Sequence, residues 1–201
     1  MENNTQLKEM IRSMVIDILQ GQKQEMASSQ PIKQAPRGQV EPGVFDTVDE
    51  AIQAAKAAQA RFEDCTLATR EKVIADIRAA MRPRVQELAQ KTVDETGMGR
   101  VADKVLKLNL TLNKTPGVED LVTECETGDN GMTLYELSAY GVIGAITPST
   151  NPAETLICNS IGMLAAGNAI FFSVHPGAKN LSRELVSELN QVIAKSIGIE
   201  N

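Results

Sequence analysis

The sequence has 201 residues, of which 42% are hydrophobic, so it is long enough for one large or two small domains with a real core. Its 26 acidic and 20 basic residues give a net charge of −6, which disfavours a nucleic-acid or anionic-membrane surface. There is no export signal, and every apolar stretch is broken well short of the roughly 18 residues that a membrane-spanning helix needs. Function is therefore expected in a pocket or an interface.

Residues 5–20 have the pattern of an amphipathic helix, with charged and polar residues on the opposite face. The apolar face consists of Leu7, Met10, Ile11, Met14, Val15, Ile18 and Leu19. Residues 21–43 are rich in Gln, Ser, Pro and Gly and predict a flexible linker. An apolar-faced helix on a linker favours docking to a partner protein, the alternatives being packing on its own domain or binding at a membrane surface.

Four helices are predicted between residues 44 and 116, with no convergent polar cluster among them. Thr47-Val-Asp-Glu50 is a capping box for the first, which reaches Phe62. The others run from about Thr66 or Thr69 to Met81, from Pro83 to Thr96 with Gly97 as the stop, and from about Val101 to Lys114. We expect these helices to pack around the sheet described next.

A β-hairpin is predicted over about residues 121–139, because apolar and polar residues alternate on both sides of Gly128-Asp-Asn-Gly131. An apolar run from Gly141 to Thr147 then reads as a buried strand, followed by a helix that Gly167-Asn168 stops and a second strand over 169–174. A further helix is expected from about Leu181 to Lys195. Strands joined through a helix are almost always parallel, so the fold class is α/β.

Because parallel strands end at the same edge of a sheet, the loops 147–151 and 173–179 should lie side by side, where open α/β sheets bind ligands. Thr147-Pro-Ser-Thr-Asn-Pro152, Leu164-Ala-Ala-Gly-Asn168 and Phe172-Ser-Val-His-Pro-Gly-Ala-Lys179 resemble the aldehyde dehydrogenase superfamily. More narrowly, they resemble its CoA-acylating branch, the propionaldehyde and acetaldehyde dehydrogenases of propanediol and ethanolamine utilization in bacterial microcompartments. The similarity covers most of residues 40–201.

The resemblance implies an incomplete aldehyde dehydrogenase-like, Rossmann-type parallel sheet with an N-terminal helical wrap and a protruding β-hairpin. Residues 44–201 would be the N-terminal part of the NAD-binding domain. Residues 1–20 would form a targeting helix, with 5–20 docking onto a microcompartment shell protein in the lumen of the compartment, within the cytoplasm. The hairpin would pair subunits into a homo-oligomer. The reaction would convert a short aldehyde, NAD and coenzyme A to acyl-CoA and NADH.

The same resemblance implies the site residues. Asn151 would donate a hydrogen bond to the oxyanion of the reacting aldehyde, while the alternative is that it only caps the following helix. The expected cofactor contacts are Thr147, Pro148, Ser149, Thr150, Ser173, His175 and Gly177. His175 is expected to contact cofactor and not to act as a general base, and no metal site is expected.

The nucleophilic cysteine of the family is expected downstream of residue 201. Cys65, Cys125 and Cys158 are odd in number, lack metal-ligand spacing and predict reduced thiols. Cys158 is interpreted as buried helical packing. The chain is thus expected to be truncated and inactive alone. The alternatives are a non-catalytic cargo or assembly protein that binds shell or full-length subunits, or, less favoured, a free-standing nucleotide-binding module. The sequence leaves the choice of aldehyde open.

Overall fold

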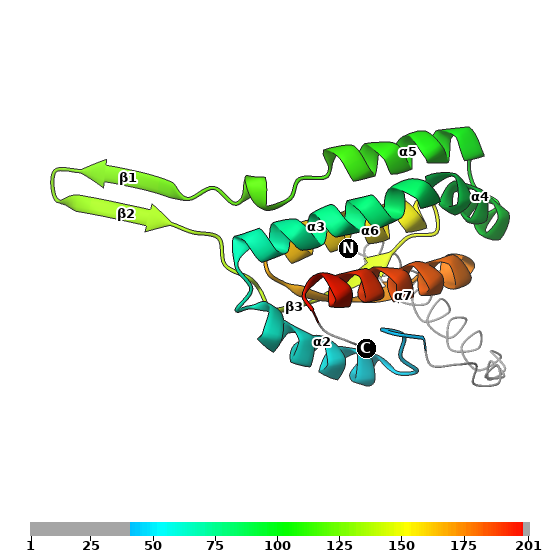
Figure 1. The fold of residues 1–201 in the computed structure, drawn as a ribbon, viewed down its shortest axis with the longest axis horizontal. Helices are drawn as coiled ribbons and strands as arrows, with labels where there is room; N and C mark the ends of the chain where they lie inside the picture. The colour runs from blue at the N-terminus through cyan, green and yellow to red at the C-terminus, as the bar shows by residue number, and fades with distance from the viewer. Residues whose placement is uncertain (1–40, 199–201) are drawn as a thin grey trace, which may run out of the picture. The chain divides into compact units, whose positions relative to one another are not determined.

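The computed structural model describes residues 41–198 (Figure 1). The helix predicted over residues 5–20 and nearly all of the 21–43 linker lie outside this range. Within the part of the chain that the structure describes, no helix has the length and apolar character needed to cross a membrane.

The first two helices begin where the sequence predicts. Helix α2 spans Val48–Phe62, and its capping box is complete: the Glu50 amide donates to the Thr47 hydroxyl at 3.2 Å, and the Thr47 amide donates to the Glu50 carboxylate at 3.2 Å. Helix α3 spans Leu67–Met81, and Thr66 is its N-cap. These side chains satisfy backbone donors that the first turn of a helix leaves without partners.

Helices α4 (Val85–Thr96) and α5 (Val101–Lys114) follow, with one difference from the prediction. Pro83 lies in a 3₁₀ turn, Arg82–Arg84, that continues from α3, and α4 itself begins two residues later than expected. Proline lacks an amide hydrogen and is tolerated where no helical hydrogen bond is needed, which a junction provides as well as a first turn. Gly97 ends α4 with φ 66°, as predicted.

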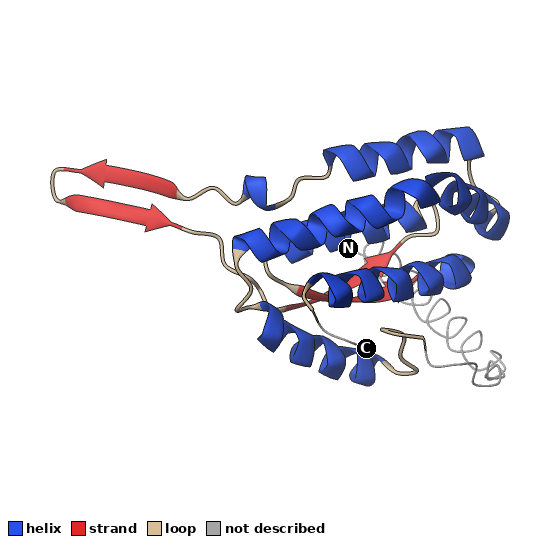
Figure 2. Ribbon diagram, viewed as in Figure 1, coloured by secondary structure: helices blue, strands red, loops and turns tan. Residues whose placement is uncertain are grey.

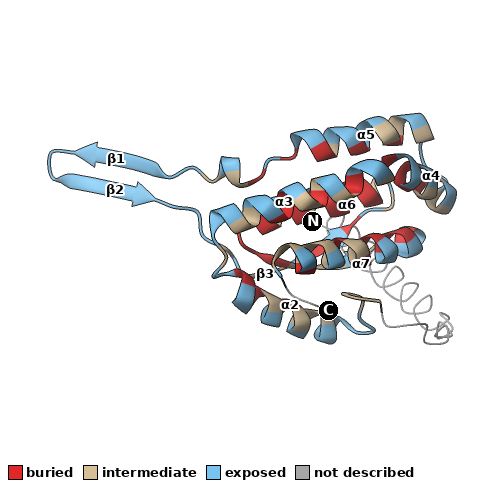
Figure 3. Cartoon of the chain, in the orientation of Figure 1, coloured by how far each residue is buried: buried red, intermediate tan, exposed pale blue. Residues whose placement is uncertain are grey.

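The hairpin consists of β1 (Glu124–Gly128) and β2 (Gly131–Tyr135), paired antiparallel around a two-residue turn. All residues of both strands are exposed, and the hairpin projects away from the helices (Figures 1 and 3). The predicted hairpin is confirmed, and it makes no hydrophobic core of its own.

Strands β3 (Val142–Thr147) and β4 (Ala169–Val174) are parallel and joined through α6 (Pro152–Ala165). The register pairs the first residues of the two strands with each other and the last residues, Thr147 and Val174, with each other. A 3₁₀ turn, Pro176–Ala178, leads to α7 (Lys179–Ser196). The predicted α/β unit and its parallel pairing are confirmed.

Helices form most of the described structure, and their packing makes the core (Figure 2). Helices α2 and α6 contact the strand pair, α3 packs mainly on α6 and α7, and α4 and α5 pack on each other and on α6. Helices α3 to α7 each contribute almost fully buried side chains, including Ile77, Leu88, Leu108, Ile157 and Leu185. Burying such side chains contributes roughly 1.5 to 3 kcal/mol each. Because α6 contacts both strands and helices α3, α4, α5 and α7, it lies at the centre of these stabilising contacts.

Among residues 41–198 the parallel sheet has two strands. Ile146 on β3 is 87% exposed, although it lies in an apolar run typical of a buried strand. The Ile146 side chain therefore lies on a part of the sheet that residues 41–198 leave uncovered.

Candidate functional site at the carboxyl end of the parallel strands

The two loops that follow β3 and β4 lie side by side, as the parallel topology predicts. A methyl group added to Gly177 would lie 4.0 Å from the Cβ atom of Ser149 and 3.2 Å from Nδ1 of His175. Thr147, the last residue of β3, is 3% exposed, and its hydroxyl has no hydrogen-bond partner among the described residues. The two loops thus bring together the residues at positions 147–150 and 173–177 that the sequence analysis predicts to contact a cofactor.

Asn151 immediately precedes α6, but its side chain does not cap the helix. Its Oδ1 atom instead accepts hydrogen bonds from the ammonium groups of Lys104, at 3.1 Å, and Lys107, at 3.2 Å. An ammonium group only donates, so the carbonyl oxygen of the amide must face the lysines. The NH2 group then lies on the side away from them, and within residues 41–198 it donates no hydrogen bond. The interpretation of Asn151 as a side-chain cap is wrong.

Lys104 and Glu154 form a buried ion pair beneath this turn. Lys104 is 3% exposed and Glu154 is 7% exposed, and Nζ lies 3.6 Å from Oε1 of the carboxylate. The Lys104 ammonium also donates to the backbone carbonyl of Thr150. The two carboxylate oxygens of Glu154 accept no hydrogen bond from the residues described here, so Lys104 supplies the compensating charge.

The predictions from sequence missed Lys104 and Lys107. One signal was present: Lys104 lies in register with Leu108 and Leu112, at helical spacing on the buried face of α5. A lysine in such a row is rarely buried without a partner. The partners, however, lie 46 to 50 positions later in the chain, and no periodic pattern connects them.

His175 forms the turn after β4. Its Nδ1 atom accepts a hydrogen bond from the Gly177 amide at 3.0 Å, so the neutral ring carries its proton on Nε2. A side chain at Gly177 would crowd the imidazole, which explains the glycine. His175, Ser173 and Gly177 are all exposed at the edge of the sheet. Their contact with a cofactor remains a prediction.

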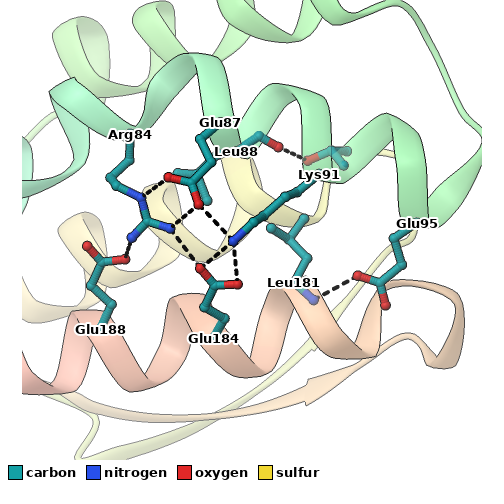
Figure 4. A network of polar contacts seen from close by, with 9 residues as sticks. Arg84, Glu87, Leu88, Lys91, Glu95, Leu181, Glu184 and Glu188 are labelled. Atoms are coloured by element: carbon teal, nitrogen blue, oxygen red, sulfur yellow. Dashed lines mark hydrogen bonds and ion pairs between the residues drawn. The ribbon is translucent and has the colours of Figure 1, made fainter.

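The N-terminus of α7, which follows this turn, is occupied by a protein carboxylate. Glu95 of α4 accepts hydrogen bonds from the backbone amides of Asn180 and Leu181, each at 2.7 Å. Figure 4 shows the second of them. A helix N-terminus often binds phosphate. Here two of the backbone amides at the N-terminus of α7 already donate to Glu95. An anion bound at this edge of the sheet must therefore accept hydrogen bonds from other groups of the loops.

A network of ion pairs joins α4 and the 3₁₀ turn before it to α7 (Figure 4). The Arg84 guanidinium contacts Glu87, Glu184 and Glu188, and Lys91 bridges Glu87 and Glu184. Hydrogen bonds from Arg84, and then from Lys91, lower the pKa of Glu87 to about 2. The hydrogen bond from Lys91 lowers the pKa of Glu184. Both carboxylates are thus ionised over the physiological range.

The three cysteines do not gather at the loops, and one prediction about them is wrong. Cys158 is exposed on α6 and not buried packing, while Cys125 is exposed on the hairpin and Cys65 is half-buried. Cys158 lies on α6, seven residues after Asn151 at the start of that helix, which at about 1.5 Å of rise per residue is about 10 Å. Residues 41–198 also contain no group of three or more His, Cys, Asp or Glu side chains arranged to hold a metal ion.

Comparisons with known proteins agree with this architecture. The family model described as "Aldehyde dehydrogenase family" matches residues 18–191. The chain is 45% identical over 199 residues to the propanal dehydrogenase (CoA-propanoylating) of Salmonella typhimurium, covering 99% of this chain and 41% of that protein. The chain therefore spans about two fifths of the length of this curated relative.

Two solved structures are similar in both sequence and fold. One is the Rhodopseudomonas palustris propionaldehyde dehydrogenase with bound propionyl-CoA, with 47% identity and a TM-score of 0.74 over 77% of this chain and 34% of that one. The other is a propionaldehyde dehydrogenase from the Clostridium phytofermentans fucose utilisation bacterial microcompartment, with 48% identity and a TM-score of 0.72 over 78% of this chain and 35% of that one. These matches and the parallel β3–α6–β4 unit show that the chain belongs to the aldehyde dehydrogenase family.

Proposed function

We propose that this chain is the N-terminal part of a CoA-acylating aldehyde dehydrogenase that converts a short aldehyde, NAD and coenzyme A to acyl-CoA and NADH in a bacterial microcompartment. One observation carries the proposal: Asn151 presents an oriented amide where the loops after β3 and β4 meet. The chain shares this region with relatives described as CoA-propanoylating.

The loops fit a nucleotide. Gly177 leaves open the space that a side chain would fill between His175 and Ser149, so an extended ligand can approach the backbone there. The hydroxyls of Ser149, Thr150 and Ser173 supply hydrogen-bonding groups at the same edge. When bound, NAD supplies the hydride acceptor and coenzyme A supplies the thiol that carries away the acyl group. The seven predicted residues of positions 147–150 and 173–177 would hold these groups.

Asn151 would act on the aldehyde oxygen. As the carbonyl is attacked, charge develops on that oxygen, and a preoriented N–H donor stabilises it in the transition state more than in the ground state. Removing one such donor costs roughly 3 to 4 kcal/mol, or about 10² to 10³ in kcat. Since both lysines hold Oδ1, the NH2 group is oriented before substrate arrives.

The attacking thiol would come from outside these 201 residues. A nucleophile and an oxyanion donor must both lie about 3 Å from the same reacting carbonyl group. Cys158 is about 10 Å along α6 from Asn151, and Cys125 lies on the projecting hairpin. We propose that the isolated chain binds cofactor without turning over aldehyde.

Two measurements on the purified chain test this function. Calorimetric titration with NAD and with coenzyme A is expected to show binding that Gly177→Val weakens at least tenfold and Gly162→Ala, on α6, leaves unchanged. Absence of binding by both cofactors would refute the proposal. NADH formation from propionaldehyde and coenzyme A is expected to be absent. Turnover that disappears in Cys158→Ser would instead make Cys158 the nucleophile.

Residues 5–20 are proposed to dock onto a microcompartment shell protein. The support is their amphipathic pattern and the match to the Salmonella protein, which covers 99% of this chain and so includes nearly all of its first 40 residues. Ile11→Asp, on the apolar face, should abolish co-sedimentation with purified shell protein, whereas Ser13→Asp, on the polar face, should retain it. Equal binding by both variants would rule out helix-in-groove docking. Shell binding without any cofactor binding would favour the cargo or assembly alternative.

The hairpin is proposed to join subunits of a homo-oligomer. Its region exposes large apolar side chains, including Leu134 at 56%, Leu137 at 74% and Tyr140 at 94%, and exposed apolar area of this kind marks an interaction surface. Leu137→Lys should shift the chain to a smaller mass in light scattering, whereas Leu110→Lys, on the exposed face of α5, should not. The interface lies elsewhere if the two variants have the same mass.

A further inference from the structure

We infer that Lys104 is the positioning residue of the site: it sets the orientation of the Asn151 amide through a buried contact from α5. The inference rests on the proposed role of Asn151 as the oxyanion donor. Nothing in the chemistry of the loops themselves determines which way a surface amide points. The orientation of the Asn151 amide is set by the two lysine ammonium groups that donate to its carbonyl oxygen.

The contacts of Lys104 reach both sides of the turn. Its ammonium donates to the Thr150 backbone carbonyl and to the Asn151 side-chain carbonyl, and it pairs with Glu154 in the first turn of α6. Two of these contacts are hydrogen bonds, to the oxygens of consecutive residues, and the third is an ion pair at 3.6 Å. Lys104 thereby ties the backbone of the turn, the Asn151 amide and the start of α6 to one point.

Burial makes this point rigid. The Lys104 side chain is 4% exposed and that of Glu154 is 9% exposed, so neither charge can turn to solvent without leaving the other unpaired. Lys107 contacts the same Oδ1 atom but is exposed, and among residues 41–198 its ammonium donates to Asn151 alone. Lys104 is therefore the anchor, and Lys107 reinforces it.

The two lysines also make the Asn151 NH2 group a stronger hydrogen-bond donor. Positive charge beside Oδ1 draws electron density toward the amide oxygen and makes the N–H bonds better donors, because linked hydrogen bonds polarise one another. Exchange of Lys104 for arginine preserves the charge and several donors, whereas methionine preserves only approximate length. The two substitutions separate charge from packing.

The test uses NMR of the 201-residue chain, with the side-chain NH2 signals of Asn151 assigned by their loss in Asn151→Ala. The key variant is Lys104→Met combined with Glu154→Leu, which removes both buried charges and leaves none uncompensated. Parent and Lys104→Arg should keep the order parameter of the Asn151 NH2 close to that of rigid backbone, about 0.85, and the double variant should give a clearly lower order parameter, below about 0.6. Thermal unfolding of the double variant should remain cooperative, with a Tm close to that of the parent.

Lys107→Met is the matched control, because it removes the other donor to the same oxygen and should leave the NH2 group ordered. The inference is overturned if the folded double variant keeps the parent's Asn151 signals, or if Lys107→Met disorders the amide as much as the double variant does. Neither outcome depends on substrate or cofactor. A chain that fails to bind NAD and coenzyme A but shows the expected NMR pattern would refute the proposed function and leave the positioning contact standing.

Discussion

Lys104→Met alone is expected to destabilise the chain strongly, for a reason visible in the environment of Glu154. The variant leaves a carboxylate that is 7% exposed and has no hydrogen-bond partner among the described residues. Breaking a buried ion pair by removing one partner costs about 3 to 5 kcal/mol. For a domain of this size, each kcal/mol lowers Tm by roughly 2 to 4 °C, so the expected decrease is roughly 6 to 20 °C. Replacing Glu154 with leucine as well should recover most of this loss.

The assay is urea unfolding of the parent, both single variants and the double variant, followed by circular dichroism. Because each single variant leaves a buried charge unpaired and the double variant leaves none, the double-mutant cycle should give a coupling energy above about 3 kcal/mol between the two side chains, beyond the usual range of about 0.5 to 3 kcal/mol for contacting residues. The reasoning is refuted if Lys104→Met loses less than about 1 kcal/mol, since that is the range of exposed ion pairs.

Two further predictions concern stability. Gly167→Ala should lower the free energy of unfolding in urea by roughly 1 to 2 kcal/mol, because φ of Gly167 is 81° and the new methyl group would lie 2.7 Å from the Arg70 guanidinium. Gly162→Ala should instead raise it by roughly 0.5 to 1 kcal/mol, because Gly162 lies inside α6 with open space around it. Equal effects would show that backbone conformation does not decide the outcome. The hydrogen bond from Arg84 lowers the folded-state pKa of Glu87 to about 2, so its contribution is present above the unfolded pKa of about 4.3 and is lost as pH falls toward 2. Glu87→Gln should therefore reduce the dependence of the free energy of unfolding on pH between about pH 5 and 2. The reduction should be less than about 1 kcal/mol, because the Glu87 side chain is half exposed. An unchanged pH dependence below pH 5 would contradict this prediction.

Local signals predicted most of the elements. The Thr47 capping box, the Gly97 stop and the glycines that flank the hairpin turn act over three or four residues, and the structure has each of them in place. Pro83 was placed less well, because its restricted φ suits a 3₁₀ junction as readily as the first turn of an α-helix. The choice between these depends on how α3 and α4 pack, which local sequence does not encode.

The candidate site was predicted in part. Parallel pairing of β3 and β4 brings their following loops together, so topology alone predicted that Ser149 lies beside the turn at Gly177. The burial of individual side chains did not follow from the topology. Cys158 was expected to be buried because it lies in an apolar helix, yet it is exposed on the face of α6 that the other described elements leave uncovered.

The sequence by itself determined the α/β class, the hairpin, the parallel strand pair and the resemblance to aldehyde dehydrogenases, because these follow from periodicity, turn chemistry and ordered motifs. Only the tertiary structure decided that Lys104 lies under the Asn151 turn and that Glu95 closes the N-terminus of α7. Both contacts join residues at least 47 positions apart. A buried charge or a capping carboxylate acquires its partner only when helices pack, so its role depends on three-dimensional proximity and not on spacing along the chain.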